Sequence, residues 1–159
     1  MRLKVLPLLA ACLAGIGTAA ESCPWLNTAT AGGALGGAVS SVTVKRAKTG
    51  DDGSCDFVRR QGSLVMELHI ETETLPSPAT GFASYSVRCG SDALTLKGIG
   101  NEALACSSGG NDELSVRVVS RVRERAFLVQ IKTNDRSAQR RELGDKAYKI
   151  AELVAGFLF

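Results

Sequence analysis

The cysteines constrain this chain more than any other feature, because four of them follow an N-terminal export signal. Residues 1–20 contain a basic start, an apolar run over 5–16 and small residues at the end. This order is typical of a secretory signal peptide. We therefore expect a signal peptide over 1–20 and one disulfide-bonded domain over 21–159, located in the periplasm or outside the cell.

Four cysteines remain after that signal: Cys23, Cys55, Cys89 and Cys106. An even number of cysteines in an exported chain predicts two disulfides, and three pairings are available. We favour Cys23–Cys55 and Cys89–Cys106, because they close moderate loops of about 32 and about 17 residues. Zinc is the competing interpretation. The chain has no CxxC pair, and its single histidine, His69, lies far from every cysteine in sequence, so we expect no metal site.

A fifth cysteine leaves a second route of export open. The segment Leu9-Ala10-Ala11-Cys12 resembles a bacterial lipobox, in which the cysteine becomes a lipid anchor. Only eleven residues precede Cys12, and the apolar character continues beyond it, so we favour cleavage after Ala20. No later segment is long and apolar enough to predict a transmembrane helix.

Removal of the signal also changes the charge of the chain. The full sequence carries a net charge of +3, but Arg2 and Lys4 leave with the signal, so 17 basic residues face 16 acidic ones. The expected mature net charge is +1, which gives no overall attraction to nucleic acid. The sequence also indicates no cofactor.

Alternating side chains predict antiparallel strands. Over 63–71 the apolar residues Leu64, Met66, Leu68 and Ile70 alternate with polar ones, as in a strand with one buried face and one wet face. A second hairpin is expected over 114–122 and 126–133, with Arg123, Glu124 and Arg125 in its turn.

Helical spacing predicts one long helix and two short ones. Apolar residues recur at helical intervals from about Ser137 to Phe157, and shorter helices are expected near 27–35 and 79–88. Short connections favour neighbouring antiparallel strands. The expected fold is α+β: a curved antiparallel sheet of about six strands, with the C-terminal amphipathic helix packed on one face and two shorter helices.

Three features resemble those of a known type of domain. They are the cysteine-containing start, the helix that ends in Gly-Gly with Cys55 in a strand, and the segment Gly98-Ile99-Gly100-Asn101-Glu102-Ala103. The chain resembles small exported bacterial domains of unknown function, common as lipoproteins in actinobacteria, over most of 23–159. Asn101 stands where those domains usually have an acidic residue. The resemblance implies a fold type and a cell-envelope setting, and no activity.

The distribution of charge supplies the candidate binding site. Residues 50–113 contain 10 acidic and 4 basic residues, whereas 114–159 contain 5 acidic and 10 basic ones. Arginines crowd the second hairpin: Arg117, Arg121, Arg123 and Arg125. Guanidinium groups bind carboxylate and phosphate well, so these residues are the candidate contact for an anionic partner. The alternative is that they are solvated or pair with the acidic segment.

We expect no catalytic residue. His69 lies between Glu67 and Glu71 on the polar side of its strand, where a solvated cluster is the simpler interpretation. The first hypothesis is therefore a non-catalytic binding module for an anionic protein or envelope polymer. The alternative is a structural or inhibitory interaction domain with an apolar patch, anchored by Trp25 if that side chain is exposed. An enzyme with a deep pocket at His69 is the third.

Overall fold

The fold is seen in a computed structural model that describes residues 22–47, 52–110 and 112–159. The expected signal peptide and Cys12 lie outside the described residues. The elements, in chain order, are α1 (Thr28–Leu35), β1 (Ser41–Arg46), β2 (Gly53–Gln61), β3 (Leu64–Thr74), α2 (Pro78–Ser86), the 3-10 helix η1 (Val87–Asp92), β4 (Leu94–Leu96), β5 (Glu102–Gly109), β6 (Leu114–Val122), β7 (Arg125–Thr133) and α3 (Arg140–Leu158).

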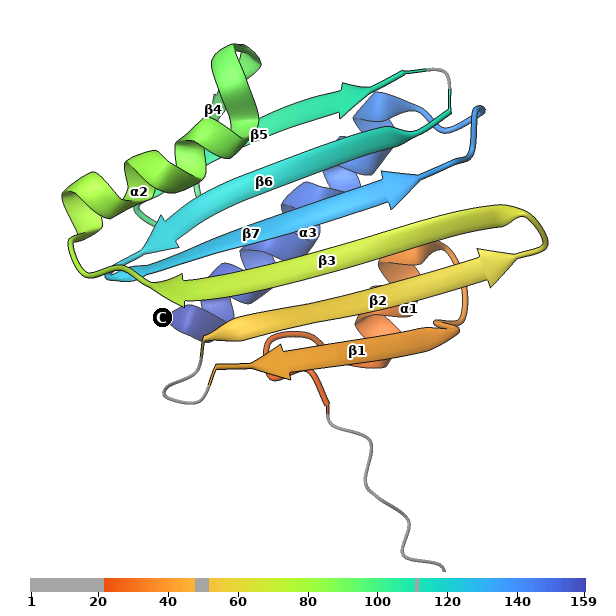
Figure 1. The fold of residues 1–159 in the computed structure, drawn as a ribbon, viewed down its shortest axis with the longest axis horizontal. Helices are drawn as coiled ribbons and strands as arrows, with labels where there is room; N and C mark the ends of the chain where they lie inside the picture. The colour runs from red at the N-terminus through yellow and green to blue at the C-terminus, as the bar shows by residue number, and fades with distance from the viewer. Residues whose placement is uncertain (1–21, 48–51, 111) are drawn as a thin grey trace, which may run out of the picture.

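The strands form one open antiparallel sheet in the order β1-β2-β3-β7-β6-β5-β4 (Figure 1). The expected α+β fold is confirmed, with seven strands in place of about six. Two hairpins turn in two residues each, because Gln61 pairs with Leu64 and Val122 pairs with Arg125. Only β1 and β4 lie at the edges of the sheet.

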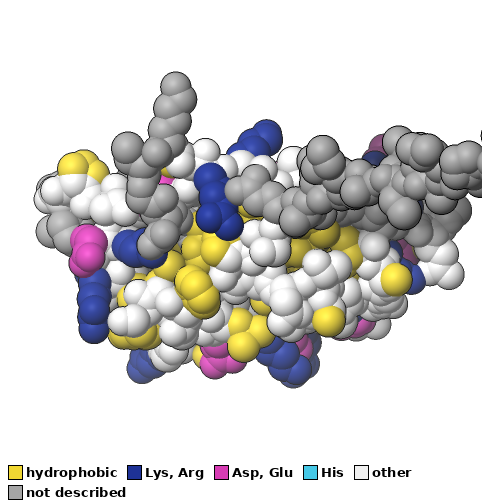
Figure 2. Space-filling view, turned by 90° about the horizontal axis from the view of Figure 1, so that it is seen from below, with side chains coloured by type: hydrophobic (Ala, Val, Ile, Leu, Met, Phe, Trp, Pro, Cys, Tyr) yellow, Lys and Arg dark blue, Asp and Glu magenta, His cyan; other side chains and the backbone are white. Residues whose placement is uncertain are grey.

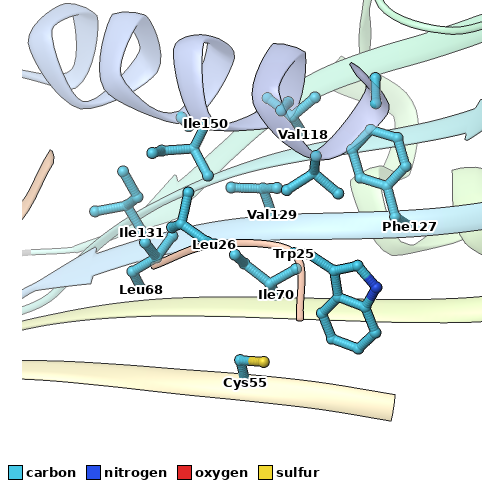
Figure 3. Close-up of a cluster of buried hydrophobic side chains, with 14 of the residues drawn as sticks. Trp25, Leu26, Cys55, Leu68, Ile70, Val118, Phe127, Val129, Ile131 and Ile150 are labelled. Atoms are coloured by element: carbon cyan, nitrogen blue, oxygen red, sulfur yellow. The ribbon is translucent and has the colours of Figure 1, made fainter. Parts of the chain in front are cut away.

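One face of the sheet carries the main hydrophobic core. Helix α3 crosses behind β6 and β7, and α1 lies behind β2 and β3 (Figure 1). The buried stripe of α3 confirms the predicted amphipathic helix, and it includes Leu143, Ala147, Ile150, Val154 and Leu158. Together with the inward side chains of the strands, these residues form the single large cluster that positions the rest of the molecule (Figure 3).

The N-terminal segment is fastened to this core by Trp25 and by a disulfide. The Trp25 side chain is 4% exposed and points from the segment that leads into α1 into the same core cluster as Ile70 (Figure 3). Asn27 caps the helix by accepting a hydrogen bond from the Thr30 amide at 2.8 Å. The favoured disulfide pairing is confirmed: Cys23 is bonded to Cys55, and Cys89 to Cys106.

The opposite face of the sheet is only partly covered. Leu75 and the α2 residues Phe82 and Tyr85 pack on an apolar area of β6 and β7 formed by Val119, Ala126 and Leu128. No described helix covers this face over β1, β2 and the neighbouring part of β3, which look toward the viewer in Figure 1. Among the described residues, no helix has the length and apolar character needed to cross a membrane.

Candidate functional site

A row of polar side chains crosses the open face of the sheet. Strand register places Thr43, Asp56, His69, Gln130 and Arg117 opposite one another on β1, β2, β3, β7 and β6. Alternate residues of a strand point to opposite faces, so all five point away from the core formed by their neighbours. We call these five residues the polar row.

His69 is held at the centre of the polar row by two carboxylates. Its Nδ1 lies 2.7 Å from Asp56 Oδ1, and its Nε2 lies 3.6 Å from Glu71 Oε2. These contacts, with Glu71 first and Asp56 second, raise the pKa of His69 above 6.5, although partial burial opposes them. Because both ring nitrogens face carboxylates, the imidazole is stabilised in its protonated form and is poorly placed to accept a proton from a substrate.

Glu71 links the polar row to the helical cover. Its carboxylate accepts two hydrogen bonds from the Arg88 guanidinium, each at 3.0 Å, and the Tyr85 hydroxyl donates to it at 3.3 Å. The contact with His69 and the bonds from Arg88 and Tyr85 lower the pKa of Glu71 from 4.5 to about 2. Arg88 also stacks 4.4 Å from the centre of the Tyr85 ring. The network therefore fixes η1 and the end of α2 to β3.

Arg117, the first of the candidate arginines, completes this network. With the Gln130 amide oriented so that its oxygen faces β6, that oxygen accepts from Arg117 Nε at 2.8 Å and from Nη2 at 3.2 Å. Arg117 Nη1 donates to the backbone carbonyl of Arg88 at 3.0 Å. All three nitrogens of the guanidinium thus have intramolecular partners, so Arg117 stabilises the fold.

The open face is hollowed beside the polar row. A concavity of ≈ 500 Å³ lies over β1, β2, β3 and β7, and Lys45, Glu67 and Lys132 line it together with members of the row. Its charges are mixed, since Asp56 and Glu67 lie between the two lysines. Among the described residues, no group of three or more His, Cys, Asp and Glu side chains is arranged to hold a metal ion.

The other candidate arginines lie around the turn between β6 and β7, on two faces of the sheet. Arg121 donates from Nη2 to Glu102 Oε1 at 2.9 Å and from Nη1 to the carbonyl of Arg123 at 2.7 Å. Arg125 pairs with Val122, so it points to the face opposite Arg121, where its Nη2 lies 3.7 Å from Asp52 Oδ1. The four arginines therefore do not form one continuous patch.

Arg123 occupies the tip of this turn and is exposed. Its backbone has a φ of 55°, the only positive φ at a non-glycine residue among those described. Such a conformation is uncommon outside Gly, Asn and Asp, and it persists where the surroundings enforce it. The Arg123 amide donates to Asn101 Oδ1 at 2.7 Å, while its carbonyl accepts the bond from Arg121. The arginine guanidinium makes no ion pair with the described residues.

The Gly98–Ala103 segment is what holds the turn. Gly100 has a φ of 60°, and a Cβ there would lie 2.4 Å from the Arg121 carbonyl oxygen. Asn101 donates its amide to that same oxygen at 2.7 Å, and Ser120 Oγ donates to the Ile99 carbonyl at 3.2 Å. The segment is therefore a packed turn with a structural role, and its glycines allow close approach to β6.

The four arginines were predictable from the sequence, but the residues that position them were not. Arg88 arrives from η1, and only the folded chain brings it beside Glu71 and Arg117. Asn101 could be expected in a turn, but nothing in the sequence linked it to Arg123, which lies 22 residues away. Trp25 is buried, so the version of the apolar-patch hypothesis that uses it as an exposed anchor is wrong.

No family model and no curated protein sequence matches this chain. The features that bear on function are therefore the open sheet face and the arginine turn, which comprises Arg121, Arg123 and the Asn101 that supports them.

Proposed function

We propose that this chain is an exported, non-catalytic binding module for an anionic partner, a protein or an envelope polymer. The partner contacts Arg123 at the β6–β7 turn, and a partner long enough to pass Leu75 and α2 also reaches the open polar face over β1, β2 and β3. The observation that carries the proposal is an exposed arginine on a turn whose amide and carbonyl are both fixed by other residues.

Fixed backbone geometry favours binding because less conformational freedom is lost when the partner arrives. Arg121 and Asn101 act as positioning residues, since each bonds to the Arg123 backbone and Arg121 is itself held by Glu102. The Arg123 guanidinium can then form charge-assisted hydrogen bonds with a carboxylate or a phosphate. The state of His69 supports a non-catalytic role, because both of its ring nitrogens face carboxylates.

Charge reversal tests this proposal. The exported protein with both disulfides intact is titrated against polyglutamate and against a phosphate-bearing polymer, and the Arg123→Glu variant is compared with Arg141→Glu. Arg141 is also exposed, but it lies in the first turn of α3, at the other end of the sheet, and its reversal changes the net charge equally. We expect Arg123→Glu to weaken binding to one polymer at least about tenfold, equivalent to about 1.4 kcal/mol.

The Arg141→Glu control distinguishes direct contact with Arg123 from long-range electrostatic attraction by the whole protein. If Arg141→Glu weakens binding as much as Arg123→Glu, long-range charge explains the binding and the assignment to the turn is wrong. If neither polymer binds the wild-type protein, the proposal of an anionic partner fails for both chemical classes.

A second candidate function rests on apolar side chains at the end of α3. Leu153 and Phe157 are 51% and 58% exposed, lie one helical turn apart, and line a groove with Trp25 and Pro24. This patch keeps the hypothesis of a structural or inhibitory interaction domain open without an exposed tryptophan. Binding of a partner that is lost in Leu153→Ser and retained in Arg123→Glu would favour this second function.

A further inference from the structure

The concavity on the open face holds charged groups that do not neutralise one another. Glu67 lies directly opposite Lys132 in the register of β3 and β7, but Lys132 Nζ lies 3.8 Å from Glu113 Oε1. Glu67 makes no ion pair with the described residues. Lys45, at the β1 end of the concavity, likewise makes none within the described part of the chain. The concavity therefore presents both an anionic and a cationic group to a ligand.

Asp56 and Glu67 form the anionic part of the concavity. Asp56 lies opposite His69, two residues along β3 from Glu67, so the two carboxylates belong to diagonal neighbours on adjacent strands. Diagonal neighbours lie about 7–8 Å apart, so one ammonium group between them can contact both carboxylates. Asp56 Oδ1 is already bonded to His69, but a carboxylate accepts several hydrogen bonds.

Lys45 and Thr43 form the cationic part. They are two residues apart on β1, so both side chains point to the same face, and both line the concavity. An ammonium and a hydroxyl at this spacing can donate to one carboxylate. Basic and acidic side chains both appear among the described residues on the β1 side of the molecule, so the approach from that side carries both signs of charge (Figure 2).

The floor between the two parts is fixed by intramolecular bonds. His69 is held between two carboxylates, and the Gln130 amide oxygen accepts from Arg117. Side chains that are already ordered lose little conformational freedom when a ligand binds. The volume of ≈ 500 Å³ lies in the range of small-ligand sites.

The strand register sets the length of a ligand that reaches both parts. The midpoint between Asp56 and Glu67 lies about one and a half strand spacings and about two residues from the midpoint between Thr43 and Lys45, which is about 10 Å. An extended tripeptide spans about 10 Å, whereas a dipeptide spans about 7 Å. Opposite charges at this separation are those of the two free ends of a tripeptide.

We propose that this concavity binds a free, extended peptide of about three residues by its two ends. Its amino terminus lies between Asp56 and Glu67, and its carboxylate accepts hydrogen bonds from Lys45 and Thr43. The inference does not depend on the proposed function, because neither Arg121 nor Arg123 lines the concavity.

Titration with trialanine tests the two ends separately. The protein, with both disulfides intact, is titrated by calorimetry with trialanine, with N-acetyltrialanine, which lacks the ammonium, and with trialanine amide, which lacks the carboxylate. Each blocked peptide should bind at least about tenfold more weakly than trialanine, because each loses charge-assisted hydrogen bonds. Dialanine should also bind more weakly, because it is too short to reach both parts of the concavity.

Matched variants assign the binding to the concavity. Glu67→Gln and Lys45→Gln should each weaken trialanine binding at least about tenfold. Glu152→Gln and Lys149→Gln change the net charge equally at exposed positions of α3, and they should bind as wild type. Arg123→Glu, which tests the arginine turn, should also bind trialanine as wild type.

Three results would overturn the inference: trialanine does not bind, a blocked peptide binds as tightly as trialanine, or the α3 variants weaken binding as much as the variants in the concavity.

Discussion

The support of the arginine turn by Gly100 leads to a quantitative prediction with an internal control. Both Gly100 and Gly62 adopt a left-handed conformation, with φ of 60° and 61°, but only Gly100 lies against other atoms. At Gly62 an added Cβ meets nothing within 4 Å, whereas at Gly100 it would lie 2.4 Å from Arg121 O and 2.9 Å from Ser120 Oγ.

The two alanine variants therefore separate the free-energy cost of a left-handed backbone from the cost of a steric clash with neighbouring atoms. A left-handed residue other than glycine costs about 1 kcal/mol, so Gly62→Ala should lower the free energy of unfolding by about that amount. Gly100→Ala adds displacement of the Arg121 carbonyl and loss of its bond from the Asn101 amide, worth about 1–2 kcal/mol more. We expect a total of about 2–3 kcal/mol, and a melting temperature about 3–6 °C below that of Gly62→Ala.

Urea denaturation of the two variants with disulfides intact measures both free energies. If Gly100→Ala and Gly62→Ala differ by less than about 0.5 kcal/mol, Gly100 does not hold the β6–β7 turn and the reasoning is refuted. Gly100→Ala should also weaken binding of an anionic polymer, because Arg123 is no longer fixed, while Gly62→Ala should not.

Three further outcomes follow from the contacts described. Replacing Cys89 and Cys106 by alanine opens a 17-residue loop and should lower the free energy of unfolding, measured by urea denaturation, by about 3 kcal/mol. A loss under about 1 kcal/mol would mean that the disulfide hardly restricts the unfolded chain. Asn101→Ala should cost about 1 kcal/mol through the lost bond to the Arg123 amide, whereas Asn101→Asp keeps an acceptor and should cost less than half of that, both measured by thermal unfolding. The folded-state pKa of His69 is raised above 6.5, so its stabilising contribution is fully present below about pH 6.5 and is lost as pH rises through the folded-state value. The difference in the free energy of unfolding between wild type and His69→Gln should therefore shrink over that rise in pH. A constant difference would contradict the ion pairs.

Much of the fold was predictable because local patterns and packing agree. Alternation over 63–71 predicted β3, and the apolar spacing after Ser137 predicted α3, since each side chain set has one buried face. The disulfide pairing followed from loop length, and the structure confirms it. The sheet extends to a seventh strand because the three-residue β4 pairs with β5, and α2 continues into η1, which contacts β5.

The candidate site was less predictable for reasons of geometry. The expected turn included Arg125, but the hairpin turns in two residues, so Arg125 enters β7 and shares the face of Phe127. A one-residue difference in a turn moves every later side chain to the other face of a strand. The left-handed backbone of Arg123 was also not predictable from the sequence, since two-residue hairpin turns usually contain Asn, Asp or Gly at such a position.

The salt dependence of binding tests the central claim most directly. The affinity of the protein, with both disulfides intact, for the anionic polymer that binds it best is measured across a range of salt concentrations, for wild type and for Arg123→Glu. Contact between Arg123 and an anion predicts that wild-type affinity falls steeply with salt and that the variant, already weaker, falls less steeply. An affinity that does not change with salt, or equal slopes for the two proteins, would contradict the assignment of the arginine turn as the binding site.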